Sequence, residues 1–143
     1  MRVGGESAMS LSLDLGRVKE LEWYLHDHCF DLESVRYDPP SQTWRISYAG
    51  HVTPGTGCLA IFLSLWNLLL GRKPKPRREH VMDQTLEITA VQGWNCEDRE
   101  RIRMYTFHEA KFDAARSRLV LHFCENCDVF LKVGSGARLT FEP

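Results

Sequence analysis

The sequence has no apolar run long enough to cross a membrane, and none follows the first Met as a secretory signal would. Its longest apolar stretch, residues 58–70, would span only about 20 Å as a helix, against about 30 Å for a bilayer core. The cysteines number five, an odd count that does not suit a framework of disulfides. We therefore expect a cytoplasmic protein with mostly free thiols, without a membrane span.

Motifs of common enzymes are also missing. The glycines at 55–57 are too few for a phosphate-binding loop, and those at 134–136 join two expected strands. No serine occupies a nucleophile elbow, and nothing indicates a Cys–His pair. The sequence assigns no catalytic residue and favours a protein that is not an enzyme.

Charge of one sign is scarce, because the formal net charge is only -1. Any attraction to nucleic acid must then be local. One basic run exists, formed by Arg72, Lys73, Lys75, Arg77 and Arg78. Arg101 and Arg103 could extend it, but no aromatic residue is interleaved for base stacking. We expect an exposed basic linker at 72–80, with a nucleic-acid-binding loop as an alternative.

Two segments of the chain resemble each other without a gap. Residues 36–48 (RYDPPSQTWRISY) align with residues 111–123 (KFDAARSRLVLHF). In each, an aspartate (Asp38, Asp113) opens a polar turn, and an alternating apolar pattern begins six positions later at Trp44 or Leu119. Each segment is typical of a β-hairpin, so we expect both hairpins to frame one antiparallel sheet.

The predicted fold class is α+β, mainly an antiparallel meander of about seven strands with one or two helices packed on it. A flexible tail at 1–13 precedes a single domain at 14–143. Because apolar parity changes between Leu32 and Val35, we expect a bulge near Glu33 and Ser34. The second half is expected to be a meander, so its strands that are neighbours in sequence should be neighbours in the sheet. The expected strands are residues 30–38, 43–49, 84–92, 101–112, 118–124, 128–133 and 137–141.

Helical spacing appears in two places. Residues 15–25 carry an apolar stripe that Ser12 or Asp14 could cap. Residues 58–70 carry a wider one, and Gly71 stands where a C-cap glycine belongs. Burial of this second helix on the sheet is the expected outcome. A strand, a protein-docking surface around Trp66 and a helix lying on a membrane surface are the alternatives.

Two short motifs suggest metals. Cys124 and Cys127 have the spacing of half a zinc knuckle, and Cys29, Cys96, His26 or His28 would have to complete a tetrahedral site. A redox role would need a helix after the first thiol, whereas strands are expected here, so a plain hairpin turn is favoured. The His26–Asp27 pair occurs in metal-dependent phosphohydrolases, but a turn capped by Asp27 is the simpler interpretation.

Residues 25–48 have a His-Asp pair, an apolar strand, an aromatic-Asp turn at Tyr37 and Asp38, and a second alternating strand. This pattern resembles small bacterial β-rich domains, a group that includes immunity proteins of toxin systems. The resemblance implies a non-enzymatic bacterial protein that binds another protein, of immunity type as one option. The expected contact surface combines Trp66 and Trp94 with the basic run, because aromatic anchors dominate interfaces. Zinc binding is the alternative from a different class.

Overall fold

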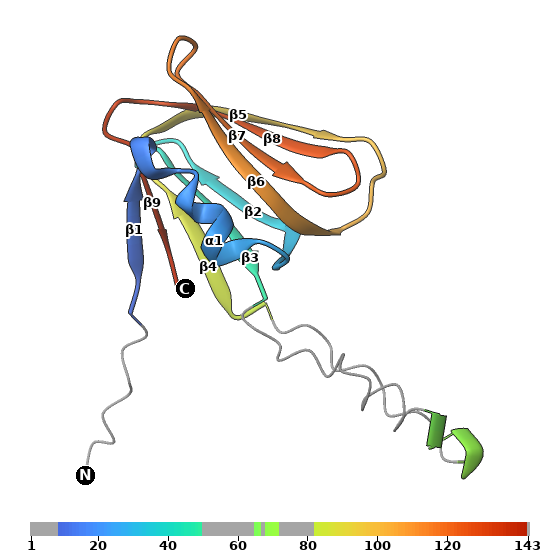
Figure 1. The fold of residues 1–143 in the computed structure, drawn as a ribbon. Helices are drawn as coiled ribbons and strands as arrows, with labels where there is room; N and C mark the ends of the chain where they lie inside the picture. Colours follow the sequence, from blue (N-terminus) through green and yellow to red (C-terminus); the bar gives the residue numbers. More distant parts are fainter. Residues whose placement is uncertain (1–8, 50–64, 67, 72–81, 143) are drawn as a thin grey trace.

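The computed structural model describes residues 9–49, 65, 66, 68–71 and 82–142 (Figure 1). Within these ranges the chain is mainly β, with nine strands, one short helix and one 3-10 turn. In chain order these are β1 (Leu11–Asp14), η1 (Leu15–Arg17), α1 (Glu20–Leu25), β2 (Cys29–Asp38), β3 (Thr43–Tyr48), β4 (Gln84–Ile88), β5 (Val91–Asp98), β6 (Met104–Asp113), β7 (Arg118–Phe123), β8 (Cys127–Val133) and β9 (Arg138–Phe141).

All nine strands pair antiparallel, in the order β1-β9-β4-β3-β2-β6-β7-β8-β5. The predicted antiparallel sheet is therefore confirmed, although it has more strands and less helix than the sequence suggested. The predicted strand over 84–92 is two strands, because the chain turns at Thr89 and Ala90. Ala90 has a left-handed φ of 56°, which ends the extended run.

Both predicted hairpins form, as β2–β3 and β6–β7, and they are joined through their first strands (Figure 1). Adding 75 to a residue number in the first hairpin gives its counterpart in the second, as Arg36 and Lys111 illustrate. Phe30 on β2 pairs with Tyr105 on β6, and Tyr105 is also the residue that the shift of 75 assigns to Phe30. The pairing of β2 with β6 is therefore self-complementary, and a pseudo-two-fold axis passes between Phe30 and Tyr105.

The symmetry extends to the flanking strands. Trp44 on β3 lies opposite Ile88 on β4, as its counterpart Leu119 on β7 lies opposite Leu131 on β8. The fourth strand of each half then pairs with the other half, since β5 lies on β8 and β9 lies on β4. The prediction that sequence neighbours pair is wrong for these two strands, because each crosses to the opposite half.

Each hairpin turn accepts a hydrogen bond from a residue beside one of the two crossings. The Val91 N–H donates to the Gln42 carbonyl at 2.8 Å, and the Val133 N–H donates to the Ser117 carbonyl at 3.0 Å. Gln42 and Ser117 are counterparts, and both have left-handed φ angles, of 51° and 49°. The two hairpin turns therefore share a backbone conformation as well as a sequence pattern.

The N-terminal segment differs from the prediction. Residues 11–13 were expected in a flexible tail, but they belong to β1, which pairs with β9 along its whole length. Leu13 is fully buried, so this strand covers an otherwise open sheet edge with an apolar side chain. Asp14 does cap the next turn, accepting a hydrogen bond from the Arg17 N–H at 3.1 Å. The predicted helix over 15–25 is only η1 and the short α1.

The core lies on the inner faces of the two hairpins. Trp44, Ile46 and Tyr48 are fully buried, which confirms the face predicted from alternation. Burial of each such side chain is worth about 1.5–3 kcal/mol. The predicted bulge in β2 is also confirmed, because the register with β3 shifts between Asp31 and Arg36.

The predicted helix over 58–70 lies largely outside the described residues. Its described part is a helical turn that ends at Gly71, whose φ of 65° confirms the C-cap prediction. The described apolar side chains here are not packed on the sheet as expected, since Leu65, Leu68 and Leu69 are 57%, 72% and 82% exposed. In the part of the chain that the structure covers, no helix is long and apolar enough to span a membrane.

Candidate functional site

The bulge in β2 forms one wall of a surface groove. Between Asp31 and Arg36 the register of β2 with β3 shifts by three residues. At the counterpart bulge in β6, the register with β7 shifts by one residue. Asp31 fixes the longer bulge, because its carboxylate accepts from the Glu33 N–H at 3.0 Å and its carbonyl accepts from the Ser34 hydroxyl at 2.6 Å. Ser34 in turn accepts from the Ser47 N–H at 2.8 Å. The side-chain oxygen thus replaces a lost ladder bond.

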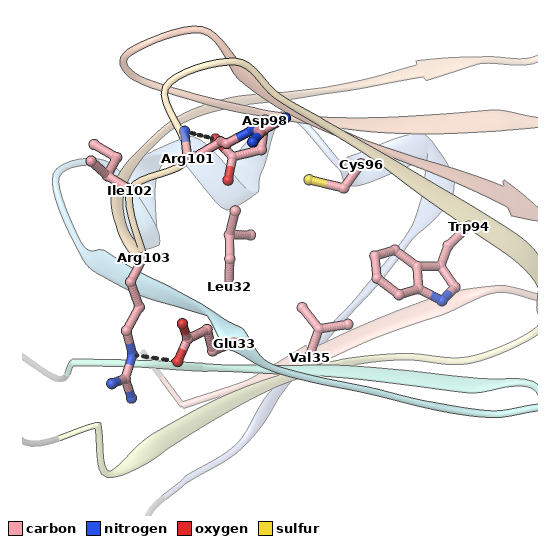
Figure 2. A pocket seen from close by; sticks show the side chains of 9 residues that line it. All are labelled: Leu32, Glu33, Val35, Trp94, Cys96, Asp98, Arg101, Ile102 and Arg103. Carbon is pink, nitrogen blue, oxygen red and sulfur yellow. Dashed lines mark hydrogen bonds and ion pairs between the residues drawn. The ribbon is translucent and has the colours of Figure 1, made fainter.

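The groove lies between this bulge and the edge strand β5, with a volume of about 320 Å³ (Figure 2). We call it the open groove. Its floor and walls are mostly apolar, with charged side chains at one end, where β5 runs into β6. The lining residues are Leu32, Glu33 and Val35 on β2, Trp94, Cys96 and Asp98 on β5, and Arg101, Ile102 and Arg103 on the connecting loop.

An ion pair fastens the charged end. The Arg103 guanidinium donates to both Asp31 carboxylate oxygens, at 3.0 and 2.8 Å, and lies 3.4 Å from Glu33. This bidentate bond holds the pKa of Asp31 below its usual range, aided by the Glu33 N–H, while burial works in the opposite direction. Because Arg103 is already bound to carboxylates, it does not extend a free phosphate-binding patch as the sequence suggested.

Two further contacts organise β5. The Tyr105 hydroxyl donates to the Asp98 carboxylate and accepts from the Ile102 N–H, which positions the loop at the groove's end. Cys127 lies opposite Asp98, on the same face as Cys96, and the two thiols share a hydrogen bond. That bond lowers the pKa of Cys96 and, with burial, raises the pKa of Cys127. The two thiols are therefore each other's hydrogen-bond partners.

The pseudo-symmetry relates the walls of the open groove to a second pair of walls, on β6 and β9, which we call the filled groove. The counterparts of Leu32 and Val35 are Phe107 and Ala110. The counterparts of Trp94 and Cys96, matched through strand register, are Leu139 and Phe141. All four counterparts are buried. The same wall is present in both halves, but in the described structure Leu32, Val35 and Cys96 are only partly buried and Trp94 is exposed.

Helix α1 covers the filled groove, because it packs against β6. Its Leu21 and Leu25 are fully buried in the cluster that contains Phe107 and Phe141. The ring of Tyr24 packs 5.5 Å from the ring of Phe141. After the helix, the Asp27 N–H donates to the Phe107 carbonyl at 3.2 Å. One helical turn with two leucines is thus enough to close a groove of this shape.

Among the described residues no helix covers the open groove, and the lengths of the connections explain this difference. Residues 15–28, before β2, are long enough to carry η1 and α1, whereas only residues 99–103 connect β5 to β6. The corresponding hydrogen bonds still form, since the Leu32 N–H donates to the Arg103 carbonyl and the Phe107 N–H donates to the His28 carbonyl. The strands are therefore placed alike, and within the described ranges the connection at 99–103 has no helix to cover Leu32, Val35 and Trp94.

The structure separates most of the residues predicted to form sites. Trp94 lies in the open groove, packed edge-on against buried Trp44. Trp66 is exposed on the turn before Gly71. Arg72, Lys73, Lys75, Arg77 and Arg78 lie outside the described residues. The sequence analysis did not identify Leu32, Val35, Cys96 and Ile102 as lining a binding groove. The parity change between Leu32 and Val35 did predict the bulge that forms one wall.

Of the candidate zinc ligands, the structure brings Cys96 and Cys127 together but separates the others. Cys124 is exposed in the hairpin turn between β7 and β8, Cys127 is buried, and Cys29 lies on β2. His26 follows α1 and contacts Asp27 at 3.1 Å and the ring of His108. Among the residues with described positions, no three His, Cys, Asp or Glu side chains are grouped to hold a metal ion.

The fold and the groove define a mainly β domain with two pseudo-symmetric halves. Comparison with protein families, curated proteins and solved structures returned no significant match to the chain.

Proposed function

We propose that the protein is a non-enzymatic protein-binding module that holds a short apolar helix of a partner in the open groove. One observation carries the proposal: in the pseudo-equivalent half, α1 covers the matching walls, since it contacts β6, packs Tyr24 against Phe141 of β9 and buries Leu21 and Leu25 fully. The open groove has its walls on the equivalent strands, so we expect a short helix to lie across it in the same way. Apolar helices that dock into grooves are a common mode of peptide recognition.

The size and chemistry of the groove support this proposal. A volume of about 320 Å³ holds about ten water molecules at ~30 Å³ each, which suits a ridge of one or two large apolar side chains. Leu32, Val35 and Trp94 supply apolar contact. Arg101 and Glu33 stand at the rim, where charged groups tune specificity more than affinity.

The other functions suggested by the sequence stay predictions. An immunity role would be one case of partner binding, and it requires a toxin as the partner. Zinc binding would need ligands beyond Cys124 and Cys127, and nucleic-acid binding would depend on the basic run at 72–78. The open groove uses none of these residues, so the proposal stands independently of them.

The test is selection of helical peptides from a displayed library on the full chain, followed by NMR titration with the selected peptides. We expect peptides with apolar residues three and four positions apart, and shifts of the amides at Leu32, Val35, Cys96 and Ile102. Trp94→Ala should weaken binding about 30-fold, equivalent to a loss of ~2 kcal/mol at an interface anchor.

Trp23→Ala is the matched control. Trp23 is exposed on α1, away from the residues that line the open groove, so its removal should leave peptide affinity unchanged. Equal losses from both substitutions, or shifts confined to other surfaces, would refute the proposal.

A further inference from the structure

The helical turn before Gly71 has an apolar ridge of the kind that the open groove accepts. The Leu70 N–H donates to the Trp66 carbonyl at 3.1 Å, which gives helical geometry, and the left-handed Gly71 ends the turn. Leu65, Leu68 and Leu69 are three and four positions apart, so they lie on one face. All three side chains are more than half exposed. We call these three residues the leucine ridge.

Burial of the leucine ridge is favourable. A large apolar side chain loses about 1.5–3 kcal/mol of stabilisation when it stays in water, and contiguous exposed apolar patches mark binding surfaces. The buried face of the N-terminal segment has the same spacing, since Val18, Leu21 and Leu25 recur at three and four positions. The described chain therefore has two pseudo-equivalent grooves and two apolar helical segments. Helix α1 covers one groove, which leaves the open groove and the leucine ridge.

We infer that the leucine ridge occupies the open groove of the same chain, and that it competes there with the partner helix. This inference rests on the proposed function, because it names a ligand of the same groove. The chain position allows the contact: Ser47 lies opposite Asp31, next to Leu32 of the groove wall, and Ala49 is held to the Cys29 carbonyl at 2.9 Å. From there, residues 50–64 reach up to about 50 Å at ~3.3 Å each.

The tether favours the same chain over a second copy. A ligand on a short linker is present at an effective concentration in the millimolar range, which exceeds that of free protein in ordinary solutions. If the occupied form exceeds the open form by about ten to one, an external peptide binds about tenfold more weakly than to the open groove. Disruption of the leucine ridge should therefore raise the affinity for an external peptide about tenfold.

The test compares Leu68→Glu with Leu70→Glu in the full chain. Both leucines are exposed, so both variants should fold, but Leu70 is off the ridge. We expect Leu68→Glu to shift the NMR amide signals of Leu32, Val35 and Cys96, with no dependence on protein concentration, and Leu70→Glu to leave them unchanged. Affinity for a selected helical peptide should rise about tenfold in Leu68→Glu only.

The outcomes separate the two ideas. If groove signals shift as expected but no helical peptide binds any variant, the ridge occupies the groove and the proposed partner function fails. If peptides bind wild type and Leu68→Glu equally, with identical groove signals in both, the function stands and the inference is overturned. Shifts that grow with concentration, together with dimers in sedimentation, overturn it in favour of a second copy.

Discussion

The Asp31–Arg103 pair provides a sharp test of how the open groove is built. Its two partners differ in exposure, because the side chain of Asp31 is 7% exposed and that of Arg103 is 60% exposed. Removal of either charge breaks the same bidentate bond. The group left behind, however, is buried in one case and solvated in the other, so the two substitutions should have unequal costs.

The magnitudes follow from this asymmetry. Asp31→Asn leaves Arg103 free to rehydrate and keeps an oxygen for the Glu33 N–H, so we expect a loss of about 1.5 kcal/mol, the low end for charge-assisted bonds. Arg103→Gln leaves a buried carboxylate with only the Glu33 N–H. We expect a loss of about 3 kcal/mol, the low end for breaking a buried pair.

The pH dependence has a defined sign. The pKa of folded Asp31 lies below its unfolded value of about 3.9, so the stabilisation is complete above pH ~4 and is lost as pH falls through the folded pKa. In Arg103→Gln the main cause of the lowered pKa is gone. The difference in stability between wild type and this variant should therefore shrink below pH ~4.

Urea denaturation at pH 7 and at pH 3.5, monitored by circular dichroism, measures both effects. Arg45→Gln is a suitable control, because Arg45 binds Glu87 on the sheet surface with both partners substantially exposed, and should cost below ~1 kcal/mol. If Asp31→Asn proved more costly than Arg103→Gln at pH 7, the asymmetry argument would be wrong.

Three further predictions concern the rest of the fold. Leu25→Ala should cost about 2–5 kcal/mol in urea denaturation, because it opens a cavity between α1 and the filled groove; a loss below 1 kcal/mol would show that α1 is not a structural plug. Gln42→Gly and Ser117→Gly should each stabilise by up to ~1 kcal/mol by relieving a left-handed φ, and thermal unfolding should give similar gains for these counterparts; a large loss at one position alone would contradict their equivalence. Burial raises the pKa of Tyr48 to about 12, so its stabilising effect is complete below pH ~10 and is lost as pH rises towards 12; the stability of Tyr48→Phe should fall less steeply over that range, and parallel curves would contradict this.

Local sequence patterns were sufficient to predict the two hairpins, the bulge and the buried face of β3. Each depends on residues close together in the chain: alternation at Trp44, Ile46 and Tyr48, an acidic turn at Asp38, and a parity change after Leu32. The exchange of β5 and β9 was not predictable in this way. Those pairings join residues far apart in sequence, and alternation alone does not identify the partner strand.

The candidate site was predicted only in part. Trp94 was expected at a contact surface because it is aromatic, and it does line the open groove. Its neighbours Leu32, Val35 and Ile102 look like ordinary core residues in the sequence, and the described connection at 99–103 is too short to carry a helix over them. The leucines before Gly71 were predicted to be buried, but they are exposed. An apolar helical stripe predicts burial whether or not the tertiary structure provides a surface to cover it.

The crossing of β5 and β9 has a consequence for any shorter version of the chain. A polypeptide with a single half would contain a last strand whose hydrogen-bonding partner exists only in another molecule. Two such polypeptides would have to exchange their last strands and form a dimer in order to fold. Fusion of the halves turns that bimolecular assembly into an event within one molecule, independent of dilution. Covalent linkage also lets the two halves differ, and here α1 covers one pair of walls while no described helix covers the other.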